Sequence, residues 1–113
     1  MNTQTSNRLD AAFFALSDST RRAMLARLSR GEASVGELAK PFRLSQPTIS
    51  KHLKVLERAG LIESDRDAQR RPRTLRLKPL KDISNWIEPF RAMWERRLDN
   101  LDRHLATMSD QED

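Results

Sequence analysis

Two predicted helices separated by only three residues constrain this fold more than any other feature of the sequence. Ser34 and Glu37 have the spacing of a capping box, in which each side chain accepts a hydrogen bond from the backbone of the other residue, so a helix is predicted to start at Ser34. Pro41 ends that helix within two turns. Residues 42–44 then lead to a second helix with Ser45 as its N-cap. A link this short makes the two helices cross steeply, which predicts a helix-turn-helix unit.

The second of these helices is amphipathic. It is predicted to run from Ser45 to about Ala59 and to stop at Gly60, and Pro47 falls in its first turn, where no helical hydrogen bond is lost. At 100° per residue its apolar arc, which should face the core, contains Ile49, Leu53 and Leu56. The N-terminal end and the opposite side carry polar residues first and basic residues later: Gln46, Pro47, Thr48, Ser50, Lys51, Lys54 and Arg58.

This gradient from polar to basic suits nucleic acid. Short polar side chains near a helix N-terminus reach base edges in the major groove, and lysines further along contact phosphates. We therefore predict DNA contacts from Gln46, Thr48, Ser50, Lys51 and Lys54. An ordinary amphipathic surface helix explains the apolar arc equally well. It does not explain the short capped helix before this one or the arginine-rich segment after it.

His52 lies at the border between the two sides of this helix. A metal site would need a second ligand three or four residues away, where the sequence has Val55 and Leu56. The other histidine, His104, is more than fifty residues away, and its neighbour Asp102 has no second pair to complete a site. We therefore predict no metal, and expect His52 to pack, to hydrogen-bond locally or to touch a phosphate.

Two further helices are predicted before the helix-turn-helix unit. The first has one apolar face formed by Leu9, Ala12, Phe13 and Leu16. The second is predicted to be capped by Asp18 or Ser19 and to end at Gly31 in a left-handed conformation.

After residue 60 the pattern changes from helical to extended. Residues 61–64 and 74–77 predict a two-stranded hairpin, and its tip, residues 68–73, is rich in arginine. Such a hairpin takes the position of a wing, and we predict DNA contacts from Arg70, Arg71 and Arg73, along a minor groove or its phosphates. The charge could instead protect an edge strand from aggregation. The acidic residues lie at the base of the tip and the arginines at its end, which favours DNA.

Composition excludes several classes of function. The 113 residues allow one compact domain, and the absence of cysteine excludes disulfides, thiolate metal sites and thiol catalysis. No catalytic constellation and no glycine-rich phosphate loop occurs, so neither an enzyme nor a cofactor is predicted. A polar N-terminus and the lack of an apolar run of ~20 residues predict a cytoplasmic protein without a membrane partner.

Positive charge is concentrated in the middle of the chain. The net charge is +5, and residues 51–81 hold ten Lys and Arg against four Asp and Glu, whereas residues 82–113 hold four against eight. A basic block that includes the amphipathic helix and the hairpin favours an anionic partner.

A long final helix is predicted from about Leu80 to Met108, with Pro89 bending or breaking it after its first turn. Its apolar residues recur at spacings of three and four, as in a helix packed along a partner. Trp86 and Trp94 could form an aromatic ligand site, but such residues more often belong to a core or an interface. We therefore predict a homodimer with an interface formed by Leu9, Phe13, Ile83, Ile87, Phe90, Trp94, Leu98, Leu101 and Leu105.

Residues 16–77 resemble the winged helix-turn-helix of ArsR-type (ArsR/SmtB-like) bacterial transcriptional repressors. The resemblance is carried by ALSDSTRRAMLARL (15–28), ASVGELAKPFRLSQPTISKHLKVLERAGLI (33–62) and the arginine-rich wing. It implies a mainly α fold with a small β-hairpin, a homodimer formed through the first and last helices, and repression by occupying an operator. It also implies that the DNA-reading segment contains Ser45, Gln46, Thr48, Ser50 and Lys51.

The sequence departs from many relatives at the positions where they sense metals. Those relatives use a cysteine pair in the helix that corresponds to residues 35–42, or Asp and His ligands near the last helix. This chain has no thiol in the first place and no paired ligands in the second. Its tail WIEPFRAMWERRLDNLDRHL (86–105) resembles a branch that does not sense metals, and whose inducer is often unknown.

The sequence thus predicts a single winged-helix domain over residues 1–113. It would comprise a flexible tail (1–7), helices and wing (8–79), a dimerisation helix (80–108) and a second tail (109–113). The predicted function is sequence-specific binding of double-stranded DNA, as a homodimeric repressor on an inverted-repeat operator. The alternative is a winged helix used for protein contacts without specific DNA binding.

Overall fold

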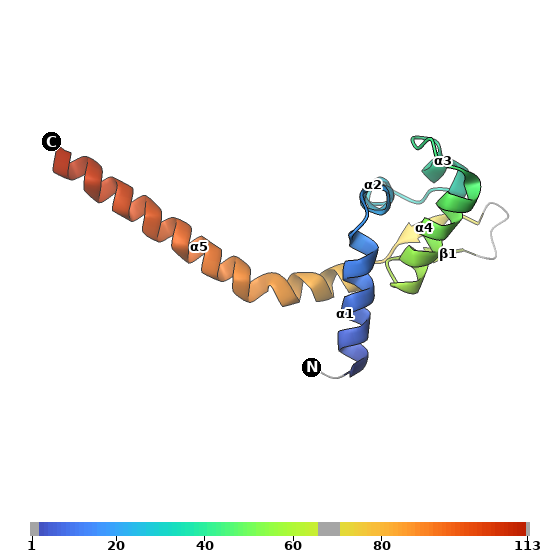
Figure 1. Cartoon of the computed structure of the whole chain (residues 1–113), viewed down its shortest axis with the longest axis horizontal. Coiled ribbons are helices and arrows are strands. Elements are labelled where there is room, and N and C mark those ends of the chain that lie inside the picture. The colour runs from blue at the N-terminus through green and yellow to red at the C-terminus, as the bar shows by residue number, and fades with distance from the viewer. Residues whose placement is uncertain (1–2, 66–70, 113) are drawn as a thin grey trace. The chain divides into compact units, whose positions relative to one another are not determined.

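A computed structural model describes residues 3–65 and 71–112, with side chains up to residue 109. The fold is mainly α with one small antiparallel hairpin, as predicted (Figure 1). Its elements are α1 (Thr3–Leu16), α2 (Ser19–Leu28), α3 (Val35–Ala39), α4 (Gln46–Arg58), β1 (Ile62–Ser64), β2 (Arg73–Leu75) and α5 (Lys78–Glu112). The chain divides into two compact units, residues 1–83 and 84–113, and the second consists of most of α5.

Local signals in the sequence set the starts of the first unit's helices. Asp18 caps α2 by accepting a hydrogen bond from the backbone N–H of Arg21 at 3.0 Å. Ser34 and Glu37 form the predicted capping box at the start of α3. Ser45 caps α4, and Pro47 lies in the first turn of that helix, as predicted.

Gly60 ends α4 because only a residue that tolerates positive φ closes a helix in this way. Its φ is +74°, and its N–H donates to the carbonyl of Glu57 while the N–H of Leu61 donates to that of Leu56. These two bonds form the Schellman motif and direct the chain from α4 into β1.

Several element boundaries differ from the predictions. The first helix already begins at Thr3, within the predicted tail, and the last continues to Glu112 and passes through Pro89 without a break. Gly31 does not form the predicted left-handed cap, because α2 ends at Leu28 with Ser29 as C-cap, and Gly31 has a φ of +136°.

The hairpin is shorter than predicted and begins its second strand earlier. Ile62 pairs with Leu75, and Ser64 with Arg73, in antiparallel register. Arg73 also exchanges two backbone hydrogen bonds with Ala33, at 3.1 and 2.7 Å, which ties the hairpin to the segment before α3. Arg73 therefore lies in β2 and not at the tip.

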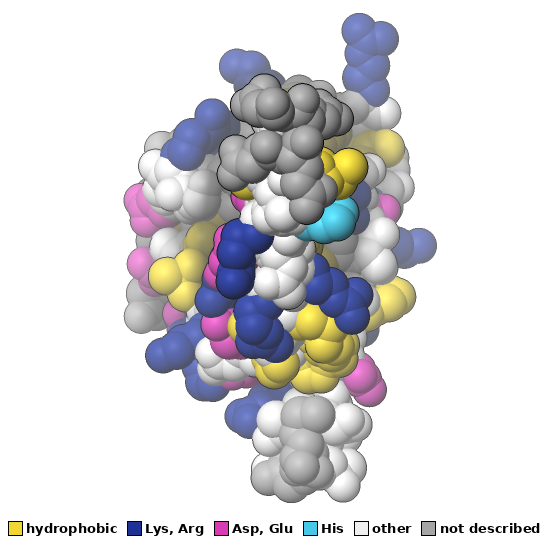
Figure 2. Space-filling view, turned by 90° about the vertical axis from the view of Figure 1, so that its left-hand side faces the viewer, with side chains coloured by type: hydrophobic (Ala, Val, Ile, Leu, Met, Phe, Trp, Pro, Cys, Tyr) yellow, Lys and Arg dark blue, Asp and Glu magenta, His cyan; other side chains and the backbone are white. Residues whose placement is uncertain are grey.

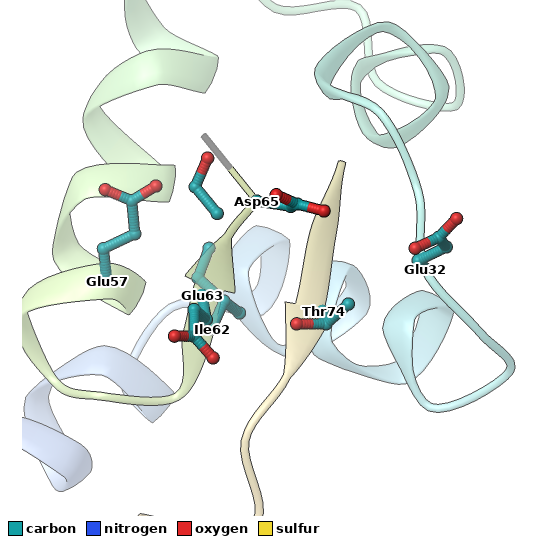
Figure 3. Close-up of a pocket in the computed structure, with 7 residues that line it drawn as sticks. Glu32, Glu57, Ile62, Glu63, Asp65 and Thr74 are labelled. Atoms are coloured by element: carbon teal, nitrogen blue, oxygen red, sulfur yellow. The ribbon is translucent and has the colours of Figure 1, made fainter. Parts of the chain in front are cut away.

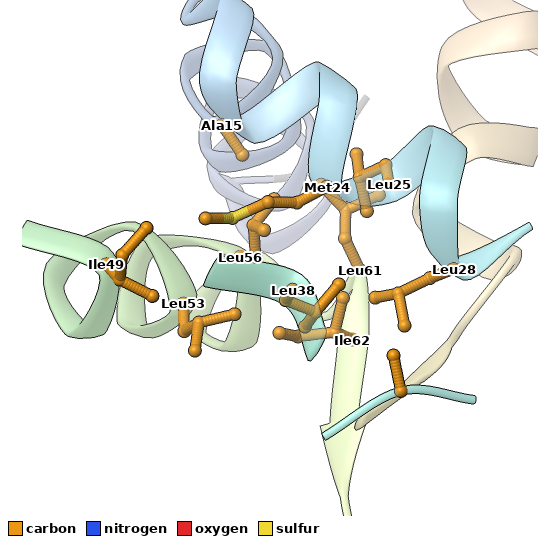
Figure 4. Packing of buried hydrophobic residues seen from close by; sticks show 11 residues of the cluster. Ala15, Met24, Leu25, Leu28, Leu38, Ile49, Leu53, Leu56, Leu61 and Ile62 are labelled. Carbon is orange, nitrogen blue, oxygen red and sulfur yellow. The ribbon is translucent and has the colours of Figure 1, made fainter. Parts of the chain in front are cut away.

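One hydrophobic core holds α4 in place (Figure 4). Ile49, Leu53 and Leu56 of α4 are almost fully buried, which confirms the predicted apolar arc. They pack within a cluster from α1, α2, α3, the segment before α3, the first residue of β1 and the residue that precedes it: Ala15, Met24, Leu25, Leu28, Ala33, Leu38, Leu61 and Ile62. The opposite side of α4 is thereby left facing outward.

A second, smaller cluster joins α1 to the second turn of α5. It consists of Leu9, Ala12 and Ile83, and both Leu9 and Ile83 are only 8% exposed. These two residues were predicted at a dimer interface, but the structure buries them against their own chain.

None of the described helices has the combination of length and hydrophobicity that a membrane span requires.

Candidate nucleic-acid interface

The outward side of α4 carries the residues predicted to read DNA. Gln46, Lys51 and Lys54 are exposed, and Ser50 is half-buried. Within the described parts of the chain, none of these four side chains has a hydrogen bond or an ion pair. One polar amide at the N-terminal end and two ammonium groups further along are therefore available to a partner, and the fold aligns them on a single helix.

Ser45 and Thr48 have a structural task as well. The Ser45 hydroxyl accepts the backbone N–H of Thr48 at 3.4 Å, and the hydroxyls of both residues lie 2.9 Å apart. A hydroxyl that caps a helix is oriented by that contact, although oxygen keeps a further lone pair. These two side chains are thus held in place at the N-terminal end of α4, whereas no contact of this kind holds the side chain of Gln46 within the described residues.

The predicted wing arginines differ in their surroundings. Arg71 is exposed and has a φ of +45°, which is uncommon for a residue other than glycine. Arg70 lies outside the described residues. The Arg73 side chain is only 15% exposed and donates from Nε to Glu57 at 3.2 Å. Its guanidinium fixes the hairpin to α4, so Arg71 is the better candidate for a DNA contact.

His52 forms local contacts, one of the three outcomes expected for it. Its Nδ1 lies 3.3 Å from Nη1 of Arg21 and 4.0 Å from the Asp18 carboxylate. Sequence reasoning missed Arg21, which is 7% exposed and also donates to backbone carbonyls of α1. Spacing could not have revealed it, because His52 lies 31 residues further along the chain.

The same corner lowers the pKa of Asp18. The main cause is the hydrogen bond from the Arg21 backbone N–H, and the positive charge of the Arg21 guanidinium acts in the same direction. The ionised carboxylate is therefore the form that caps α2.

Acidic side chains surround a hollow on another part of this unit. It measures about 700 Å³ and is lined by Glu32, Glu57, Ile62, Glu63, Ser64, Asp65 and Thr74. Figure 3 shows these carboxylates distributed over α4, the hairpin and the segment before α3. Phosphates would be repelled here, so this hollow is not a surface for DNA. Within the described residues, no three His, Cys, Asp or Glu side chains are grouped closely enough to hold a metal ion.

The C-terminal unit exposes a row of large apolar side chains. Trp94 is 65% exposed, and Trp86 stacks on Phe90 with ring centroids 5.1 Å apart. The other exposed members of the row are Ile87, Met93, Leu98, Leu101, Leu105 and Met108. Figure 2 shows hydrophobic side chains, drawn in yellow, that reach the surface. In the first unit, Phe13 of the predicted interface is 37% exposed.

Charged residues of α5 pair within the helix. Arg91 forms ion pairs with Glu88 and Glu95, and its hydrogen bond to Glu88 holds the pKa of that carboxyl below the usual range. These ion pairs lie on the polar side of α5, which is exposed to solvent. The large apolar side chains of the row are also exposed, as at a site of protein contact.

Comparisons with known proteins agree with this geometry. A family model described as a helix-turn-helix domain matches residues 16–65. The transcriptional repressor SdpR of Bacillus subtilis is 37% identical over 82 residues, which cover 73% of this chain and 91% of SdpR. The transcriptional regulator Rv2034 of Mycobacterium tuberculosis is 49% identical over 70 residues, 62% of this chain and 64% of the relative. A crystal structure of an ArsR family transcriptional regulator aligns with a TM-score of 0.71 and 40% identity, covering 78% of this chain and 97% of the other.

Proposed function

Because this chain belongs to the ArsR family and is a DNA-binding transcriptional regulator, we propose that it represses transcription as a homodimer that occupies an inverted-repeat operator. The observation that carries the proposal is the outward side of α4, where Gln46 lies at the N-terminal end and two exposed lysines follow. A catalytic function has no comparable support.

We assign different tasks to the residues of this surface. Gln46 and Ser50 read base edges in the major groove, since an amide pairs with adenine through two hydrogen bonds and a hydroxyl accepts or donates. Lys51 and Lys54 contact phosphates, and so do Arg70 and Arg71 of the wing. Ser45 and Thr48 hold the helix tip toward the DNA.

Dimerisation follows from the exposed apolar row of α5. Such a row on a small protein is stabilised by a second copy, and two-fold symmetry would place two α4 helices about 34 Å apart, one DNA turn. The proposed interface is formed by Phe13 of α1 together with Ile87, Phe90, Trp94, Leu98, Leu101 and Leu105 of α5. Bound across a promoter, the dimer would block polymerase, and its place of action is the cytoplasm, where the DNA is.

A gel-shift titration on the DNA upstream of the protein's own gene tests the proposal. We expect a complex with that DNA whose affinity falls steeply as salt rises, because neutralised phosphates release counterions. A winged helix used for protein contacts would ignore this DNA even at low salt. A reporter driven by the same promoter should gain expression when the protein is deleted, and a loss of expression would identify an activator.

A further inference from the structure

The one buried charged side chain among the described residues joins three helices. Arg21 is 7% exposed, and burial of a guanidinium is unfavourable unless its N–H groups find acceptors. Its Nε donates to the carbonyl of Ala15 at 2.8 Å, and its Nη2 to the carbonyl of Phe14 at 2.9 Å. These carbonyls end α1 and have no partner inside that helix. Arg21 thus anchors the corner between α1 and α2.

The third nitrogen of this guanidinium, Nη1, faces α4. Nη1 lies 3.3 Å from Nδ1 of His52. An arginine always remains protonated and can only donate, so Nδ1 must accept. This contact requires a neutral His52 ring with its proton on Nε2. The contact therefore predicts a tautomer of His52 as well as a partner for it.

A directional contact at His52 constrains α4 in a way that its core packing does not. The buried residues Ile49, Leu53 and Leu56 hold the helix by apolar contacts, which have little directional preference. A hydrogen bond weakens steeply when its angle changes. Ser50, Lys51 and His52 are consecutive residues of one helix. A rotation of α4 about its axis that moved the His52 ring would therefore also turn Ser50 and Lys51 away from the DNA groups that they are proposed to contact.

We propose that Arg21 is a positioning residue for DNA reading, and that its hydrogen bond to His52 sets the rotation of α4 in the major groove. This inference rests on the proposed reading role of α4. Arg21 touches no DNA in this account, and acts on base discrimination through His52.

Variants at His52 separate an acceptor from mere filling of space. His52→Leu removes the acceptor at similar size, whereas His52→Asn places a carbonyl oxygen near the position of Nδ1. The probe is the DNA sequence that the wild-type protein enriches from a random pool, compared with random DNA. We expect His52→Leu to lower the ratio of the two affinities about tenfold and His52→Asn to keep most of it. Equal ratios for both variants would overturn the proposal.

A double-mutant cycle tests the coupling to Arg21. Arg21→Met and His52→Leu should each lower the ratio, and the double variant should lower it little further, because both remove one contact. Additive losses would contradict the proposal. The melting temperature of every variant is measured beside the ratio, since a purely structural role would lower stability and leave discrimination unchanged.

The ring ¹⁵N spectrum of the free protein gives a readout that needs neither DNA nor an unstable variant. The chain has two histidines, so His52→Asn assigns the signals of His52 directly. We expect the Nε2–H tautomer, and an Nδ1–H tautomer would overturn the contact. Failure of the wild-type protein to prefer any sequence would instead refute the proposed function, while the spectrum would still report on the Arg21 contact.

Discussion

The Ser45 hydroxyl caps α4, and the family resemblance also places this residue in the DNA-reading segment. Substitution measures how much the cap contributes to stability. Ser45→Ala removes the hydroxyl and should therefore lower the free energy of unfolding by about 1 kcal/mol, as measured by urea denaturation. Ser45→Asn is the matched control, because asparagine caps equally well. Retained stability in Ser45→Ala would show that the cap contributes nothing here.

Asp18 should make stability depend on pH in the acidic range. Its pKa lies below the ordinary value of 3.8, since the folded protein stabilises the ionised form. The resulting stabilisation is fully present above pH 3.8 and is lost as the pH falls through the lower, folded value. Asp18→Asn keeps a cap and removes the titration. We expect the advantage of wild type over this variant, measured by urea unfolding, to shrink below pH 3.8; a constant difference would contradict the assignment.

Single-residue contacts could be predicted from the sequence only where the two partners are close together in the chain. The cap at Ser45 and the capping box of Ser34 and Glu37 were predicted correctly, because their partners lie three residues away. Arg21 escaped prediction, since its acceptors are carbonyls of α1 and a histidine on another helix. Contacts between distant segments leave no periodic signal in one sequence.

At the scale of the elements, the hairpin separates two arginines that looked equivalent in the sequence. Arg73 pairs with Glu57 and is mostly covered, whereas Arg71 is exposed. We expect Arg73→Gln to lower stability by about 1 kcal/mol and to leave the salt dependence of DNA binding unchanged. Arg71→Gln should leave stability unchanged and reduce the salt slope by about 1. The reverse pattern, from unfolding and salt titrations, would contradict these roles.

The elements were predicted unequally well for a physical reason. Helix α4 was predicted nearly to its ends, since its apolar arc, its cap and Gly60 are all local features. Strand β2 begins earlier than predicted because Arg73 pairs with Ala33, and that pairing depends on the tertiary fold. Pro89 does not interrupt α5, although proline disfavours a helix interior.

The whole molecule should be a dimer through the apolar row of α5. Replacing Trp94 and Leu98 by glutamate should produce monomers, because charges would then lie in the proposed interface. Arg96→Glu is the control, since residue 96 lies on the opposite side of the helix by its 200° offset. Mass in solution, from light scattering, checks both variants. A dimer that survives the double replacement, or a monomer produced by the control, would place the interface elsewhere.

The predicted dimer interface also shows what helical spacing alone can and cannot identify. The spacing of the α5 residues predicted an apolar row, and the structure shows that row exposed. The same pattern also assigned Leu9 and Ile83 to the dimer surface, whereas these two pack in one cluster within their own chain. A periodic stripe indicates burial without identifying the partner, which is why the intramolecular cluster was not distinguished from an interface.

The central claim, that α4 reads DNA bases, is tested most directly by measuring how well the variant Gln46→Ala discriminates the operator from random DNA. Affinities of wild type and variant are measured on the enriched operator and on random DNA at one salt concentration. We predict a loss of ~1–3 kcal/mol on the operator and almost none on random DNA. Lys54→Ala, the control for a phosphate contact, should weaken both complexes alike. If Gln46→Ala also weakens both alike, α4 does not read bases through this residue, and the proposed reading surface is wrong.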